Sequence, residues 1–327
     1  MNCHRGVCSK LALAGIFGLL FVVTALLAQS ARTLALADEV QAYHQDWRGL
    51  WPLWSGHALV GTAPGSGPQV GIWTITKDGH REDIRFALPG ASTIGLTDVS
   101  RRPDGALALI GGALSSDSQA ANFLAWISPD RTRQTVVRLA PYYAGAVTFA
   151  PDGTIWVAGE IVARDYDILL HFDESGRRLG SAVPRSTVGG GAPALSSRLT
   201  ASRDRIGWYT GFAAGIGQYI ELTPNGELID RFPGVPLPGH EWRARSVALS
   251  ENNDVIVYLE GGGKEHGAQR MYTLDRLNRA WVPLELPTGQ SYQAVVGFEG
   301  NAQGNTLVLR SLNRIRFYKL PGPATQH

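Results

Sequence analysis

The chain has 327 residues, of which 44% are hydrophobic and 18% charged, and its formal net charge is +2 at pH 7. This composition excludes a largely disordered chain, and the length suits one large domain or two average ones. The 39 glycines and 18 prolines predict many turns, which favours an all-β protein over a helical one.

The first residues in chain order carry the pattern of a secretory signal. Two basic residues precede an uninterrupted apolar stretch, residues 11–28, and small residues follow it. Cleavage is expected at Ala28-Gln29-Ser30 or at Ala35-Leu36-Ala37, so residues 1–37 are predicted to be a signal peptide. The alternative is an uncleaved anchor, because the apolar stretch is barely long enough to span a membrane. The sequence therefore predicts a secreted or periplasmic protein, or one that is membrane-anchored and faces outside.

Processing would change both the thiol content and the charge of the chain. Both cysteines, Cys3 and Cys8, lie in the predicted signal, so the mature chain would have no disulfide and no thiol nucleophile. Removal of residues 1–37 leaves 27 basic and 28 acidic residues, a net charge of −1. This balance argues against a nucleic-acid partner. The protein is expected to be a monomer that meets a membrane only if the apolar segment is retained.

Turn-centred hairpins recur along the chain with a period of roughly fifty residues, which is typical of a repeat architecture. The clearest copy is "VTFAPDGTIWVAGE", residues 147–160, in which Pro151-Asp152-Gly153 forms the turn between two β-rich runs. Related turns are centred at residues 55–56, 102–105, 203–205, 251–254 and 301–304.

A second, offset series of hairpins alternates with the first, and each member ends at a proline, which cannot continue a strand ladder. These prolines are Pro89, Pro141, Pro184, Pro233 and Pro287. Each unit is a four-stranded meander, and radial repetition of such sheets is a β-propeller. Residues 38–322 are therefore predicted to form one six-bladed β-propeller of four-stranded antiparallel blades, with a tail at 323–327. A β-solenoid is the alternative, but its rungs are far shorter.

The last repeat ends one strand short of a full blade, while residues 34–43 precede the first recognisable innermost strand. We expect this N-terminal segment to pair with residues 313–320 and to supply the missing outer strand. The pairing would join the two ends of the chain and remove an open sheet edge.

The best-defined repeat resembles the NHL-type and delta-sixty-type propeller repeats. It consists of "PYYAGAVTFAPDGTIWVAGE", residues 141–160, followed by "DILLHFDESGRRL", residues 167–179. The matching strand-ending glycines are Gly111, Gly159 and Gly211. The chain departs from the strict NHL pattern at Glu160, where an aspartate is usual. The resemblance implies the blades of an exported bacterial propeller and says little about a ligand.

In a meander propeller the short, uniform turns lie on one face and the long, irregular loops on the other, where binding is expected. "HEWRAR", residues 240–245, is the densest polar group on the loop face, and His266 in the neighbouring loop is expected to lie near it. Strand alternation predicts that one set of these side chains points into the central channel. The predicted ligand-binding residues are His240, Glu241, Arg243, Arg245, His266, Tyr142 and Glu160. The alternative is a surface ion-pair cluster in which Trp242 packs between blades.

A second polar group follows the best-defined repeat and consists of Glu160, Arg164, Asp165, Asp167 and His171. The two aspartates suit calcium, but they lack the glycine-punctuated spacing of a calcium loop, so a solvated loop is expected. No metal ligand is predicted, and calcium is the one cofactor considered. The cluster Trp47, Trp51 and Trp54 is expected to fill space between blades.

Two function classes stay open. The sequence contains neither a Gly-x-Ser-x-Gly elbow nor a His-Glu-x-x-His helix, so no catalytic residue is predicted. The first class is an exported binding or scaffold module for a protein, peptide or glycan on its irregular-loop face. The second is a calcium-dependent, lactonase-like hydrolase that uses the channel mouth. Five asparagines that such an enzyme would need at the channel fall in turns of the other face, which favours the first class.

Overall fold

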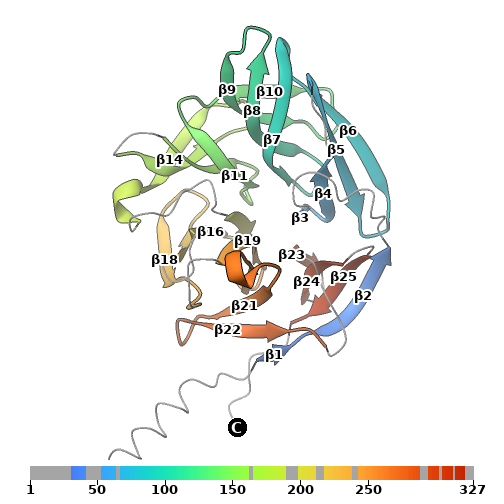
Figure 1. Ribbon diagram of the computed structural model, residues 1–327, viewed down its shortest axis with the longest axis vertical. Coiled ribbons are helices and arrows are strands. Elements are labelled where there is room, and N and C mark those ends of the chain that lie inside the picture. The colour runs from blue at the N-terminus through green and yellow to red at the C-terminus, as the bar shows by residue number, and fades with distance from the viewer. Residues whose placement is uncertain are drawn as a thin grey trace, which may run out of the picture.

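The strands of the computed structural model are arranged as blades around a central axis (Figure 1). The model describes residues 31–41, 53–63, 67–161, 165–188, 198–210, 217–237, 242–287, 294–301, 304–311 and 314–320. These residues form strands, with short 3-10 turns at η2 (Arg185–Thr187) and η4 (Gly263–Glu265), and none of them forms an α-helix. Within the same ranges no helix is long and apolar enough to cross a membrane. The predicted six-bladed β-propeller is confirmed.

The first three blades follow the chain, each with its innermost strand first. Blade 1 consists of β3 (Leu53–Ser55), β4 (Ala58–Thr62), β5 (Gln69–Thr76) and β6 (Arg81–Ala87). Blade 2 consists of β7 (Ala91–Arg101), β8 (Leu107–Ser115), β9 (Ala120–Ile127) and β10 (Gln134–Arg138). Blade 3 consists of β11 (Tyr143–Phe149), β12 (Ile155–Glu160), β13 (Asp167–Phe172) and β14 (Arg178–Pro184).

The remaining blades repeat this plan, and the last one borrows a strand from the N-terminal segment. Blade 4 consists of β15 (Arg198–Ser202), β16 (Arg205–Thr210), β17 (Gln218–Leu222) and β18 (Leu228–Pro233). Blade 5 consists of β19 (Trp242–Leu249), β20 (Val255–Gly261), β21 (Gln269–Asp275) and β22 (Ala280–Glu285), to which β1 (Arg32–Thr33) is added. Blade 6 consists of β23 (Ala294–Asn301), β24 (Gly304–Ser311), β25 (Arg314–Lys319) and β2 (Ala35–Gln41).

The Pro-Asp-Gly turns form for local reasons. In blade 3 the Gly153 N–H donates to the carbonyl of Ala150 over 3.0 Å, and Gly153 has a φ of +86°. The Asp152 carboxylate accepts the N–H of Thr154 at 3.0 Å. Glycine takes the left-handed corner without steric cost and aspartate satisfies the backbone beyond it, so these residues specify the turn together.

The hydrophobic core lies between neighbouring blades rather than along the channel. Trp156, for example, is 1% exposed and belongs to a cluster shared by blades 3 and 4. Trp54 is 6% exposed and meets the Phe317 ring edge-on, with 5.3 Å between centroids, so the prediction that it fills space between blades is confirmed. Trp47 and Trp51 lie outside the described residues.

The N-terminal segment closes the ring as predicted. Strand β2 pairs antiparallel with β25, from Ala35 opposite Lys319 to Gln41 opposite Arg314. In Figure 1 the blue β2 lies along the red β25, at the outside of blade 6. Glu39 on β2 also accepts a hydrogen bond of 2.7 Å from Arg316 on β25, and this bond holds the pKa of the Glu39 carboxyl below its usual value.

The segment before β2 adds a contact that the sequence analysis did not anticipate. Strand β1 pairs with β22 in parallel and becomes a fifth strand of blade 5. Leu34, between β1 and β2, is 2% exposed, and its N–H donates to the Glu285 carbonyl over 2.9 Å. Residues 32–37, which were predicted to belong to the signal segment, therefore take part in the ring.

Candidate functional site

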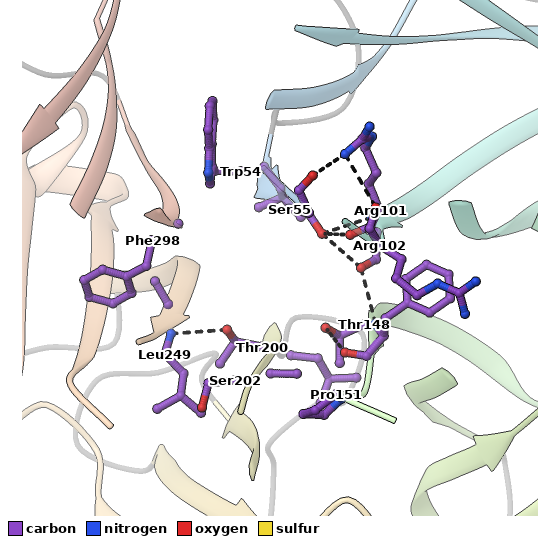
Figure 2. A pocket seen from close by; sticks show the side chains of 18 of the residues that line it. Trp54, Ser55, Arg101, Arg102, Thr148, Pro151, Thr200, Ser202, Leu249 and Phe298 are labelled. Atoms are coloured by element: carbon purple, nitrogen blue, oxygen red, sulfur yellow. Dashed lines mark hydrogen bonds between the residues drawn. The ribbon is translucent and has the colours of Figure 1, made fainter. Parts of the chain in front are cut away.

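A pocket of about 330 Å³ occupies the end of the channel at which the innermost strands run into their turns (Figure 2). Its wall consists of five-residue segments from blades 1 to 5 and two residues from blade 6. The lining residues are 53–57, 99–103, 147–151, 199–203, 247–251 and 297–298, and we call this cavity the turn-side pocket. It lies on the face that the sequence analysis assigned to the uniform turns, opposite the irregular loops.

A hydroxyl group occurs near the end of four consecutive innermost strands. Each of these residues lies on an innermost strand shortly before its turn, with Ser55 opposite Ala58, Ser100 opposite Ala108, Thr148 opposite Trp156 and Thr200 opposite Gly207. All four line the turn-side pocket. We call Ser55, Ser100, Thr148 and Thr200 the hydroxyl ring.

Three members of the hydroxyl ring bond to the backbone of a neighbouring blade. Ser55 accepts the Arg101 N–H at 3.0 Å, and Ser100 accepts the Phe149 N–H at 3.3 Å. Thr200 accepts the Leu249 N–H at 3.2 Å (Figure 2). Innermost strands of different blades do not pair with one another, so their backbone N–H groups need such side-chain acceptors. The ring therefore holds blades together and at the same time lines the pocket.

Two atoms in this wall, Ser202 Oγ and Arg101 Nε, are buried and have no hydrogen-bond partner among the described residues. Ser202 lies two residues beyond Thr200 on β15 and lines the pocket (Figure 2). A buried hydroxyl without a partner costs about 1–3 kcal/mol, so native structures rarely retain one. Because the Ser202 Oγ is closed to solvent, a ligand oxygen or nitrogen in the pocket would satisfy it only after a small movement of the wall.

The charged groups around the pocket are engaged by the protein or balance one another. The Arg101 guanidinium donates to the Gly56 carbonyl, and the Arg102 guanidinium binds Asp104, with 2.7 Å between Nη2 and Oδ2. At the rim, the exposed residues Arg203 and Glu251 bring opposite charges from neighbouring blades. The pocket therefore presents mainly hydroxyl and apolar surface, which suits an uncharged ligand.

A layer of charged side chains crosses the channel beyond the hydroxyl ring. Asp98 precedes Ser100 by two residues on β7, so it lies roughly 7 Å farther along the strand. Its carboxylate accepts the Val147 N–H at 2.9 Å. Arg198 of blade 4 donates over 2.8 Å to the carbonyl of Arg245, whose side chain binds Glu260.

Asp98 is the carboxylate in this layer whose titration is most altered. Enclosure in the channel wall raises the pKa of the Asp98 carboxyl from 3.8 to about 6, although the Val147 N–H and the Arg198 charge oppose this shift. Burial in turn lowers the pKa of Arg198, and the Asp98 charge partly restores it. The layer thus contains an ionised carboxylate that the fold solvates incompletely near neutral pH.

Replacement of Asp98 by asparagine is expected to raise the free energy of unfolding in a pH-dependent way. The folded-state pKa lies above the unfolded one, so ionised Asp98 destabilises the fold above about pH 6 and protonation relieves this below about pH 4. Asparagine keeps an acceptor for Val147. Asp98→Asn should therefore raise the free energy of unfolding more at pH 7.5 than at pH 4, by up to about 3 kcal/mol. Urea unfolding at both pH values measures this difference, and equal effects would contradict the assignment.

The predicted loop-face site is only partly within the described residues. His240 and Glu241 lie outside them. Arg243 is exposed on β19, and His266 is exposed just after η4. Arg245 is the extra residue of a bulge between Ala244 and Ser246, which interrupts the alternation that the prediction assumed.

The other predicted site residues contribute to the structure of the blades. Tyr142 is 5% exposed, and its hydroxyl donates to backbone carbonyls, including that of Val157 at 3.2 Å. Glu160 ends β12 and is half-buried. Trp242 is 3% exposed in a cluster shared by blades 4 and 5, so the prediction that it packs between blades is confirmed.

The second polar group does not converge on a metal site. Asp165 is exposed, whereas Asp167 accepts a hydrogen bond of 2.5 Å from Ser181 on the adjacent strand. His171 is buried and stacks on Trp156, with 4.3 Å between ring centroids. Arg164 lies outside the described residues. Within the described part of the chain, no three His, Cys, Asp or Glu side chains gather as metal ligands would.

Comparison with known proteins adds little to this geometry. No protein-family model matches the chain, and no curated protein matches it either. A solved gluconolactonase from Xanthomonas campestris, described as important in glucose secondary metabolic pathways, is similar at 14% sequence identity with a TM-score of 0.40. The match covers 72% of this chain and 96% of that one. The assignment of the fold rests on the strand pairing alone.

Proposed function

We propose that this chain is an exported binding module that takes a small, uncharged, hydroxyl-rich molecule, such as a sugar or polyol, in the turn-side pocket. The observation that carries the proposal is the hydroxyl ring in the wall of the turn-side pocket, with the unpartnered Ser202 hydroxyl beside it. A cavity of about 330 Å³ lies within the range of small-molecule sites. Export to the periplasm or the medium is part of the proposal and rests on the N-terminal pattern.

The chemistry of the wall supports a neutral ligand over a charged one. Serine and threonine hydroxyls donate and accept hydrogen bonds, so they match the hydroxyl groups of a polyol. Thr200 accepts from Leu249, and no described acceptor takes its own proton. The hydrolase alternative is calcium-dependent, and among the described residues no three His, Cys, Asp or Glu side chains gather as metal ligands would.

Removal of the Ser202 hydroxyl is expected to weaken binding without weakening the fold. Ser202→Ala loses no hydrogen bond within the described protein, so its free energy of unfolding should stay equal or rise by about 1 kcal/mol. Affinity for the ligand should fall about fivefold, the effect of one lost hydrogen bond. Titration of 15N-labelled protein with glycerol, xylitol, D-glucose and maltose, and with charged D-glucuronate and D-glucosamine, measures both site and affinity.

Thr135→Val on the outer strand β10 is the matched control, because it removes a half-buried hydroxyl far from the channel. Shift changes should map to residues 99–103 and 199–203 for a neutral compound and spare this strand. Shift changes at Arg243 and His266 instead would indicate that the ligand binds on the loop face. If no neutral compound in the panel binds, the proposal is wrong.

A further inference from the structure

Three side chains meet where the first and last blades join beside the turn-side pocket. Glu299 on β23 of blade 6 is 8% exposed. The Trp54 indole N–H on β3 donates to Glu299 Oε2 over 2.7 Å. His57, in the turn after β3, places its Nδ1 3.1 Å from both carboxylate oxygens. The Glu299 carboxylate of blade 6 thus binds an indole and an imidazole of the adjacent blade 1.

The arrangement fixes which nitrogen of His57 carries the proton. An indole N–H can only donate, and an ionised carboxylate can only accept. Glu299 therefore accepts from Trp54 and takes its second hydrogen bond from a protonated His57 Nδ1. In the neutral imidazole Nε2 is then unprotonated and becomes a hydrogen-bond acceptor, as when a carboxylate orients a ligating histidine.

The turn that carries the imidazole has a left-handed backbone at both of its central residues. Gly56 and His57 both have positive φ, +54° and +62°. Two-residue hairpin turns of this kind require a positive φ at both central residues, and histidine is among the side chains that tolerate it. The His57 side chain is 55% exposed and belongs to the lining of the pocket.

We propose that His57 is the specificity-determining residue of the turn-side pocket: Glu299 and Trp54 hold its ring so that Nε2 accepts a hydrogen bond from an O–H group of the ligand. The inference rests on the proposed function and deepens it. The hydroxyl ring can match either a donor or an acceptor on the ligand, whereas an unprotonated Nε2 matches only a donor. The pocket should therefore prefer a free hydroxyl to its methyl ether.

The first test reads the proton directly in the protein without ligand. Long-range 1H–15N spectra of histidine-labelled protein should show His57 protonated at Nδ1. In Glu299→Gln the side-chain amide can donate to Nδ1, so the population protonated at Nε2 should rise. A purely structural role for Glu299 predicts no such change. Wild-type protein with His57 protonated at Nε2 would overturn the inference.

The second test measures recognition, with D-glucose and its methyl ethers as probes. His57→Asn tolerates the left-handed backbone and removes Nε2, so affinity for D-glucose should fall about tenfold and the preference over the ethers should vanish. The matched control is His80→Asn, at an exposed turn between β5 and β6, which should bind as wild type. If Ser202→Ala weakens binding while His57→Asn does not, the turn-side pocket is still the binding site and the inference on His57 is wrong. If D-glucose binds to no form of the protein, the proposed function fails first.

Discussion

Replacement of Glu221 by alanine is expected to lower the free energy of unfolding by about 3–5 kcal/mol. Glu221 lies on β17 and is fully buried, at 0% exposure. Its carboxylate accepts from Arg205 Nη1 at 2.8 Å within blade 4, and from Arg276 Nη1 at 2.8 Å in blade 5. Alanine would leave two guanidinium groups partly buried with no carboxylate between them, and stranded charges of this kind carry the largest cost of a broken ion pair.

Arg276 makes this carboxylate a link between blades. Its guanidinium also donates to the Asn253 carbonyl, 2.7 Å from Nη2, in the inner turn of blade 5. Loss of Glu221 therefore disturbs the contact between blades 4 and 5 as well as one ion pair. Chemical unfolding of wild type and variant, followed by circular dichroism, measures the effect.

A surface ion pair of the same type supplies the control. Arg81 and Asp83 on β6 lie 2.8 Å apart, with their side chains 39% and 68% exposed. Asp83→Ala should cost less than about 1 kcal/mol, because solvent screens exposed pairs. Should Glu221→Ala prove too unstable to purify, Glu221→Gln keeps the shape and loses the charge, and it should still be less stable than Asp83→Ala. Equal losses for the two positions would contradict the argument from burial.

The blades could be predicted from the sequence because their signals are local. A turn such as Pro151-Asp152-Gly153 is specified by three adjacent residues, and its return at a fixed period indicates radial repetition. Ring closure by residues 34–43 followed from counting strands. Strand β1 was missed because two residues, Arg32 and Thr33, carry no periodicity and gain their place from a parallel partner 252 residues away, Leu284 and Glu285.

The candidate site was harder to predict because its chemistry is spread over repeats. Ser100 and Phe149 are 49 residues apart, and a serine in a strand carries no sign that it accepts an N–H from the next blade. A signal was nevertheless present, since a serine or threonine stands shortly before the turn of the innermost strand at Ser55, Thr148 and Thr200 as well. The irregular loops carry a higher density of charged residues, which is a stronger sequence signal than an aligned row of hydroxyls.

Bulges explain why alternation misplaced some side chains. The pairing of β19 shifts between Ala244 and Ser246, and that of β11 shifts between Ala144 and Ala146. One extra residue reverses the face to which the following side chains point. Arg243 and Arg245 therefore cannot be assigned to one inward set by counting in twos.

A chain that begins at residue 38 is expected to lose at least about 3 kcal/mol of unfolding free energy relative to one that begins at residue 31, or to fail to fold. The shorter chain lacks β1, the buried Leu34 and the first residues of β2, which pair with Tyr318 and Lys319. It therefore loses a core side chain and part of the strand that closes the ring. Thermal and urea unfolding of the two chains measures the difference.

Alanine variants of two leucines near this cut distinguish the effect of lost core packing from the effect of a shorter chain. In the chain that begins at residue 31, Leu34→Ala should cost about 2–5 kcal/mol, because Leu34 is 2% exposed. Leu36→Ala should change stability by less than about 0.5 kcal/mol, because Leu36 is 45% exposed.

The packing of residues 32–37 also distinguishes the two predicted cleavage sites, since a cut after Ala37 would remove residues that form part of the ring. If the chain is exported as we propose, N-terminal sequencing should find a start before Arg32; a mature, folded protein that begins at Asp38 would contradict both the packing argument and the role of the closing strand.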